Sequence, residues 1–232
     1  MALSSLLLLN GHGRLLGLGY TLPYLDRFRA DAEQTIAFML AKQGVTAWPR
    51  HEPSAAALVF DEELPLADSS VDCVLMIHAL EFTENPSETL KEIWRVLSPN
   101  GRVIITVPNR RGLWARFEHT PFGYGQPYSR GQLSNLLRGT NFTPTAHSEA
   151  LFCPPSQRTT ILQSAAVWER LGQKFWSLFS GVVIMEAQKK LYQGILIPKR
   201  NSRRVFVPAL PQASSLGRKK ELPKGFGRSI IL

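Results

Sequence analysis

Residues Leu64 to Val107 read LPLADSSVDCVLMIHALEFTENPSETLKEIWRVLSPNGRVIITV, and the patterns along them predict a strand, a helix and a second strand. Residues 71–77 are mostly branched and apolar, which is typical of a short strand buried on both faces of a parallel sheet. Asn85-Pro86-Ser87 indicates a helix start, and Pro99-Asn100-Gly101 indicates its stop. Residues 103–107 are a second branched apolar run. A strand, a crossover helix and a strand predict an α/β fold.

Similar patterns extend to both sides of this block. They predict strands at 14–18, 35–40, 55–60, 142–152 and 182–187, and helices at 22–32, 129–138 and 158–179. Ser129 is the expected cap of the second of these helices. The segment 109–128 is long and irregular, and loops of this length in a compact domain are usually functional or mobile.

The central block resembles the class I methyltransferases that use S-adenosylmethionine (SAM), in their type 11 branch. The residues that carry the resemblance are Asp61, Leu64-Pro65-Leu66, Asp68, Ser70-Val71-Asp72, Val74, Leu80-Glu81, Asn85-Pro86, Leu90, Glu92 and Arg95-Val96-Leu97-Ser98-Pro99-Asn100-Gly101. The match extends in outline from Arg14 to Tyr192, but only the central block is specific. The resemblance implies a seven-stranded, mostly parallel, Rossmann-like sheet flanked by helices. It also implies SAM as the cofactor and methyl transfer as the activity.

The net charge of +9 is concentrated at the C-terminal end. Residues 195–232 hold nine basic side chains and one acidic side chain, so residues 1–194 are close to neutral. The last segment is also rich in Pro, Ser and Gly, which predicts a disordered basic tail after a methyltransferase-like domain of residues 1–194. Such a tail can hold RNA or an acidic partner through salt-sensitive contacts, or can simply be solvated.

The remaining composition excludes several classes of protein. Cys73 lies in a predicted core strand and Cys153 precedes two prolines, which indicates structural thiols and no metal spacing. No apolar run approaches the roughly 18 residues that span a bilayer. The apolar residues 6–9 lack the flanks of a signal peptide, so we expect a cytoplasmic protein.

The expected cofactor site lies at the carboxyl ends of the strands, where the strand order reverses. Gly17 and Gly19 are the candidates for the tight turn after the first strand, with Tyr20 beside them. The acidic residue and the third glycine of the family pattern are missing here. Met39 occupies the region where a carboxylate would bind the ribose hydroxyls, and it can pack against the nucleoside but cannot accept those hydrogen bonds.

Three polar residues complete the expected cofactor site. The resemblance implies that Asp61, or the adjacent Glu62, lies near the adenine amino group. His78 follows the predicted fourth strand, at the edge nearest the expected methyl group. An imidazole there can take a proton from an acceptor, or it can serve as a packed or capping residue.

The segment after the fifth strand is the candidate acceptor site, because the related enzymes build their acceptor pocket there. It combines cationic, polar and aromatic side chains, which suit an anionic or aromatic acceptor. The candidate residues are Asn109, Arg111, Trp114, His119, Tyr124 and Tyr128. Trp114 and the nearby Phe117 can equally be a helix stripe packed on the sheet.

Two functions therefore remain open. The first is a SAM-dependent methyltransferase acting on an unidentified acceptor, without any nucleophilic side chain of its own. The second is a non-catalytic member of the same fold that acts as a binding or partner subunit. Three features favour the second: the altered glycine turn, the missing ribose carboxylate, and the short stretch before the first strand, which can supply little of a helix that covers the cofactor.

Overall fold

Seven strands form a single sheet in the computed structural model, which describes residues 13–41, 43–112, 125–151 and 180–191. The strand order is β3-β2-β1-β4-β5-β7-β6. The strands are β1 Arg14–Gly19, β2 Gln34–Leu40, β3 Ala56–Val59, β4 Val71–Ile77, β5 Leu97–Pro108, β6 Phe142–Ala150 and β7 Val182–Lys189. Strands β1 to β5 are parallel, and β7 lies antiparallel between β5 and β6. The predicted seven-stranded, mostly parallel sheet is confirmed.

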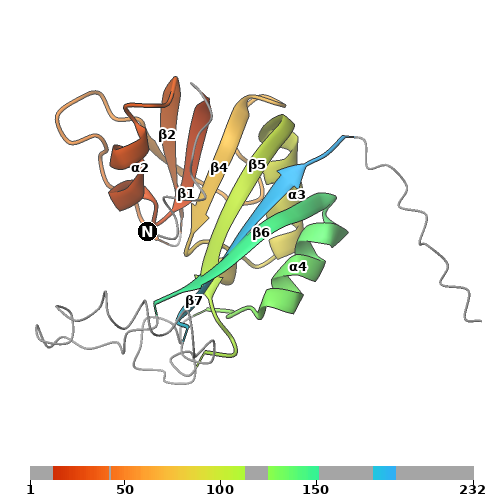
Figure 1. Ribbon diagram of the computed structural model, residues 1–232. Coiled ribbons are helices and arrows are strands. Elements are labelled where there is room, and N and C mark those ends of the chain that lie inside the picture. The colour runs from red at the N-terminus through yellow and green to blue at the C-terminus, as the bar shows by residue number, and fades with distance from the viewer. Residues whose placement is uncertain (1–12, 42, 113–124, 152–179, 192–232) are drawn as a thin grey trace, which may run out of the picture. The chain divides into compact units, whose positions relative to one another are not determined.

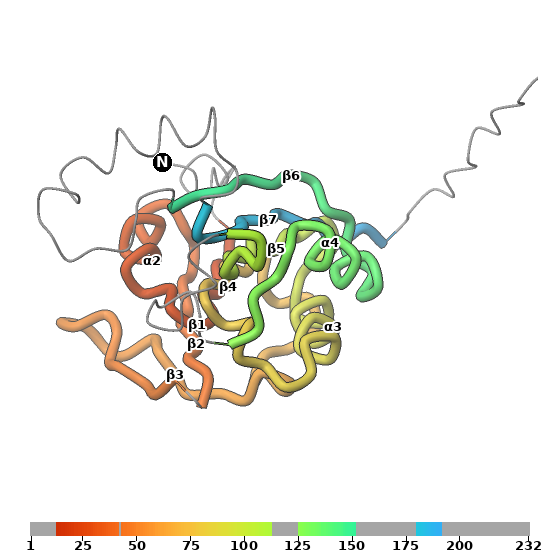
Figure 2. The backbone as a smooth tube through the Cα atoms, turned by 90° about the horizontal axis from the view of Figure 1, so that it is seen from below, coloured from red at the N-terminus to blue at the C-terminus, as the bar shows by residue number. Residues whose placement is uncertain are grey.

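Helices cover both faces of this sheet (Figure 1). The helices are α2 Leu22–Phe28, η1 Leu80–Phe82, α3 Pro86–Val96 and α4 Arg130–Gly139. Figure 2 shows α2 on one side of the sheet and α3 and α4 on the other. The buried side chains divide in the same way, because alternate residues of each strand point to opposite faces: Leu16 and Val74 belong to the cluster with α3, whereas Leu15 and Leu75 belong to the cluster with α2.

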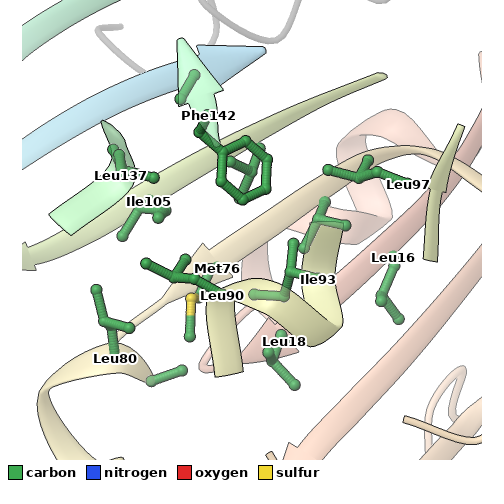
Figure 3. Packing of buried hydrophobic residues seen from close by; sticks show 14 of the residues in the cluster. Leu16, Leu18, Met76, Leu80, Leu90, Ile93, Leu97, Ile105, Leu137 and Phe142 are labelled. Carbon is green, nitrogen blue, oxygen red and sulfur yellow. The ribbon is translucent and has the colours of Figure 1, made fainter. Parts of the chain in front are cut away.

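The larger core lies between the sheet and helices α3 and α4 (Figure 3). Met76 of β4, Ile93 of α3 and Ile105 of β5 are completely buried there, as is Phe142 at 1% exposure. A fully buried side chain of this size contributes about 1.5–3 kcal/mol of transfer free energy. The apolar residues 71–77 and 103–107, from which the fold was predicted, therefore contribute to the centre of the hydrophobic core.

The helix ends follow the expected local chemistry. Helix α3 begins at Pro86, and its last turn holds Arg95. The Ser129 hydroxyl accepts from the Gln132 backbone N–H at 3.3 Å, while the Gln132 side chain accepts from the Ser129 N–H at 3.0 Å. This reciprocal pair is a capping box, so the predicted cap of α4 is confirmed.

The predicted helix stop at residues 99–101 is wrong in detail. Helix α3 ends at Val96, and Leu97 already pairs with Val71 as the first residue of β5. The register shifts between Val71 and Cys73, and Asn100 has a left-handed φ of 63°. Residues 99–101 thus lie in the irregular first part of β5. The strand begins before them, because Leu97 already pairs with β4.

The chain separates into two units, Met1–Gly194 and Ile195–Leu232. The second unit, the predicted helix 158–179 and Cys153 lie outside the described residues. Cys73 is a free, buried thiol whose pKa is raised to about 11 by burial. It is therefore a structural thiol, as the sequence predicted.

Candidate functional site

The strand order reverses between β1 and β4, and ligands of open α/β sheets bind outside the carboxyl ends of the strands at such a point. Two left-handed residues lie there. Gly19, with φ 86°, ends β1, and His78, with φ 48°, directly follows β4. Gly19 is the register partner of Ile77, and His78 follows Ile77 directly, so the two left-handed residues lie on neighbouring strand ends. We call residues 19–21 and 78–81 the switch-point site.

The glycines before this site are required by packing inside the fold. A Cβ on Gly17 would lie 2.6 Å from Leu25 Cδ1 and would also collide with Thr21. A Cβ on Gly19 would lie 2.5 Å from the Ile77 oxygen and 2.8 Å from Ala79 Cβ. Gly17 therefore packs against α2, whereas Gly19 forms the turn itself. Tyr20 follows it with an exposed side chain.

The end of β2 carries no carboxylate. Met39 and Leu40 are both buried, and the Met39 sulfur accepts from the Thr46 N–H at 3.2 Å. Gln43, three residues past the strand, donates its side-chain amide to the His78 main-chain oxygen at 2.5 Å. Because β1 lies between β2 and β4, this bond passes over the carboxyl end of β1. Sequence reasoning missed Gln43, since an isolated glutamine in a loop carries no pattern.

His78 and Glu81 form the polar centre of the switch-point site. His78 Nδ1 lies 2.7 Å from Glu81 Oε1, and Glu81 belongs to the short helix η1 that begins two residues after His78. The Glu81 side chain is 1% exposed, against 29% for His78. The His78 backbone is fixed as well, because its N–H donates to the Thr106 oxygen at 3.1 Å. The imidazole is thus the accessible end of a buried ion pair or hydrogen bond.

The segment that follows the undescribed residues encloses Glu81. The Gln126 N–H donates to the Glu81 main-chain oxygen at 2.8 Å, and a Cβ on Gly125 would lie 2.7 Å from the same oxygen. Burial raises the pKa of Tyr128, and the negative charge of Glu81 adds to the rise. Glu81 and Tyr128 are therefore close enough to interact electrostatically.

Several buried polar atoms near the strand ends have no hydrogen-bond partner in the part of the chain that the structure describes. Glu81 Oε2, Thr21 Oγ1 and Thr106 Oγ1 are such atoms. They belong to the segments that end β1, β4 and β5, at one edge of the sheet. An unpartnered buried polar group is costly, and a polar ligand can satisfy it.

Asp61 and Glu62 lie after β3, but their described partners are in the α3 region. The Thr89 hydroxyl donates to Asp61 at 3.3 Å, and the Asn85 amide donates to Glu62 at 2.7 Å. Asp61 is partly buried and Glu62 is exposed. The structure thus gives both carboxylates a role in holding the start of α3, and their predicted contact with a cofactor stays a prediction.

The candidate acceptor residues divide into three groups. Asn109 is buried and donates to the Ser180 main-chain oxygen at 3.3 Å, while its own oxygen accepts from the Arg111 N–H at 3.0 Å. It therefore joins the end of β5 to the segment before β7, which sequence reasoning did not foresee. Arg111 is exposed, and Tyr128 is partly buried beside Glu81. The other three, Trp114, His119 and Tyr124, lie outside the described residues.

A surface hollow of about 550 Å³ lies between α2 and the loop after β2. Trp48 donates to Asp26 at 2.8 Å there, and the Arg29 guanidinium lies 5.9 Å from the Trp48 ring. None of the predicted site residues lines this hollow. Four of its polar side chains are paired within the lining, Trp48 with Asp26 and Arg29 with Glu52. The switch-point site is therefore the better candidate for chemistry.

The described ranges lack both a metal-binding cluster and a membrane-spanning helix. No three histidine, cysteine or carboxylate side chains lie close enough together to bind a metal ion. Among the same residues, no helix is both long and apolar enough to cross a membrane.

Part of the chain is similar to known proteins. Residues 16–105 match the family described as "Methyltransferase domain". An uncharacterised protein of Methanocaldococcus jannaschii is 28% identical over 103 residues, covering 43% of this chain and 46% of that protein. The chain therefore matches about half the length of this relative.

Solved structures agree on the fold. One similar chain comes from the complex between the Haloferax volcanii Trm112 methyltransferase activator and a methyltransferase, with a TM-score of 0.58, 17% identity, and coverage of 80% of this chain and 86% of that one. Another is a SAM-dependent methyltransferase of Thermotoga maritima, described as a possible histamine N-methyltransferase. It has a TM-score of 0.53, 21% identity, and coverage of 81% and 87%. At these identities the similarity shows the fold alone.

Proposed function

Since this chain carries a class I methyltransferase domain of the type 11 branch, we propose that it transfers a methyl group from SAM to an acceptor at the switch-point site. The observation that carries the proposal is the pair of left-handed residues, Gly19 and His78, at the reversal of strand order. The fold implies where a nucleoside cofactor would bind, and this pair provides a turn and a polar side chain at that place.

The described residues fit the methionine end of SAM better than its ribose. The unpartnered oxygens of Thr21, Glu81 and Thr106 are polar groups that a charged amino-acid moiety can satisfy. The main chain of Gly19 and Tyr20 would hold that moiety. At the end of β2, Met39 is the proposed packing contact for the nucleoside, and the Gln43 amide is our candidate for the ribose hydroxyls.

The bound cofactor would supply an electrophilic methyl group. The protein would then contribute positioning and exclusion of water, since direct attack by the acceptor needs no nucleophilic side chain of the enzyme. His78 is the polar side chain we assign to the acceptor side of the site. Asp61 and Glu62 remain proposed contacts to the adenine end.

The acceptor is proposed to approach from the segment after β5. Arg111 is exposed there and offers a planar cation to an anionic or aromatic acceptor. Gln126 bonds to the Glu81 main chain, and the charge of Glu81 acts on Tyr128, so this segment adjoins the switch-point site. Trp114, His119 and Tyr124 keep their predicted roles in the same pocket.

Calorimetric titration and thermal unfolding with SAM test this function. A ligand present at a thousand times its dissociation constant stabilises a protein by about 4.1 kcal/mol. We therefore expect 1 mM SAM to raise the melting temperature by several degrees if the affinity is micromolar. Wild-type protein that neither binds SAM nor gains stability would contradict the proposal and favour a non-catalytic partner subunit.

A protein partner forms a second part of the proposal. The similar Haloferax chain comes from a complex with an activator protein, and the basic residues 195–232 offer this chain a charged segment for RNA or an acidic partner. The cytoplasmic location remains a prediction from the sequence.

A further inference from the structure

We propose that His78 and Glu81 form a proton-accepting pair, and that the methyl acceptor is consequently an O–H or N–H nucleophile that must lose its proton during transfer. This inference rests on the proposed function, because it names the class of acceptor for the same site. It goes further by assigning the proton a destination, Nε2 of His78, and by assigning Glu81 the role of a positioning residue.

The first argument is the direction in which the imidazole is held. His78 Nδ1 lies 2.7 Å from Glu81 Oε1, and a carboxylate accepts hydrogen bonds but cannot donate them. In the neutral ring the proton therefore lies on Nδ1, which leaves the Nε2 lone pair free. Within the described part of the chain no hydrogen bond to Nε2 is present, and the ring is the exposed member of the pair.

The second argument is that the position of His78 is fixed from both neighbouring strands. Its N–H is bonded to Thr106 of β5, and its oxygen accepts from Gln43, which follows β2. The φ of His78 is 48°, which is an unfavourable backbone conformation for a residue with a side chain. Non-glycine residues held in such conformations concentrate at functional sites.

The third argument is the environment of the Glu81 carboxylate. Its side chain is almost completely buried, and its Oε2 atom has no partner among the described residues. Among the described residues, His78 contacts this carboxylate, and the charge of Glu81 acts on Tyr128, whose pKa is raised. A buried negative charge attracts the imidazolium that forms when His78 accepts a proton, and the surrounding protein screens this attraction less than water would.

The proposed step balances as follows. The acceptor X–H bond breaks and its proton moves to His78 Nε2, while the electron pair left on X forms the bond to the methyl carbon. The methyl–sulfur bond breaks and its electron pair remains on sulfur, which becomes a neutral thioether. The positive charge thus passes from sulfur to His78, which later releases the proton to water. Phenols, alcohols and amines in their ammonium form require this proton transfer, whereas thiolates and carboxylates have already lost theirs.

The first test reads the tautomer of His78 directly and needs no acceptor. Long-range proton–nitrogen NMR correlations of the full chain are recorded at pH 9, with His78 assigned by the loss of its signals in His78→Gln. We expect a proton on Nδ1 and an unprotonated Nε2, and a change in this preference in Glu81→Ala. The exposed His51 and His147 are internal controls whose signals should not move. A proton on Nε2 of His78 would overturn the proposal.

The second test separates this inference from the proposed function. SAM binding is measured by calorimetry, and methyl transfer is measured with a simple phenol, a primary amine and a thiol as probe acceptors. We expect His78→Gln to lower kcat on the phenol or amine by about 10²–10⁴-fold, with a much smaller effect on SAM affinity and on transfer to the thiol. Wild-type rates in His78→Gln would overturn the pair, whereas the absence of SAM binding in wild type would overturn the proposed function.

Discussion

The main-chain N–H of Tyr20 donates to the oxygen of Ile77 at 2.8 Å, so the turn after β1 is bonded to the last residue of β4. His78 follows Ile77 directly. The turn and the histidine therefore move together, and any change that opens the turn will displace the imidazole. This bond joins the two halves of the switch-point site, which are almost sixty residues apart in the sequence.

Substitution of Gly19 tests this coupling. Gly19→Ala places a Cβ 2.5 Å from the Ile77 oxygen at a φ of 86°. We expect a loss of about 1–3 kcal/mol in the free energy of unfolding, because a strained backbone and a steric collision coincide. Urea unfolding measures this loss. The His78 NMR signals should shift as well, and unchanged signals would contradict the coupling.

A matched control exists in α4. Gly131 lies in the first turn of the helix, and a Cβ there meets nothing within 4 Å. Gly131→Ala should stabilise the protein by roughly 0.5–1 kcal/mol, since alanine loses less conformational freedom in a helix. A destabilising Gly131→Ala would mean that the Gly19 result cannot be attributed to its turn.

The Glu92–Arg95 pair predicts a pH dependence of stability. Hydrogen bonds from Arg95 lower the pKa of Glu92, burial opposes this shift, and the Leu64 N–H adds to it. Because the folded pKa lies below the unfolded value, the stabilisation is present at neutral pH and is lost as the pH falls through the folded pKa. Glu92→Gln should therefore cost about 1–3 kcal/mol at pH 7 and progressively less as the pH falls below the unfolded pKa.

Urea unfolding of wild type and Glu92→Gln at several pH values measures this difference. Glu88→Gln is the control on the same helix, because the Glu88–Lys91 pair is exposed and such pairs contribute at most about 1 kcal/mol. A constant difference between wild type and Glu92→Gln from pH 7 to pH 3 would show that the charge of Glu92 is not what stabilises the loop at Leu64.

Strand β3 is the terminal strand of the sheet that the structure describes. It exposes Leu58 and, just past its end, Phe60, which are 50% and 73% accessible. Apolar edge strands favour association between chains. Phe60→Lys should leave the free energy of unfolding within about 0.5 kcal/mol of wild type and reduce self-association. Sedimentation over a range of concentrations measures this, and increased association would contradict it.

The basic segment 195–232 is a candidate for binding RNA or an acidic partner, and the alternative is a solvated tail. Contacts of this kind weaken steeply with salt, because binding releases counterions. A chain ending at residue 194 should lose retention on an RNA column, whereas the full chain should elute at a salt concentration that depends on its nine basic residues. Equal retention of both chains would exclude the tail as the binding element.

The sequence by itself determined the sheet, α3 and the cap of α4. Buried parallel strands require continuous apolar runs, and helix starts require particular residues such as Pro86 and Ser129, so both are visible over short windows. The sequence also placed Gly19 and His78 at strand ends. It misjudged the start of β5, because pairing with Val71 is a contact between distant residues.

Only the tertiary structure decided how the site is built. The burial of Glu81 depends on Gly125 and Gln126, which come more than forty residues later in the chain. Gln43 reaches His78 across the end of β1, because the strand order places β2 and β4 on either side of that strand. Asn109 is held by Ser180 through the antiparallel pairing of β5 and β7. Local patterns record burial and backbone preference, whereas these contacts follow from strand order, which no short stretch of sequence specifies.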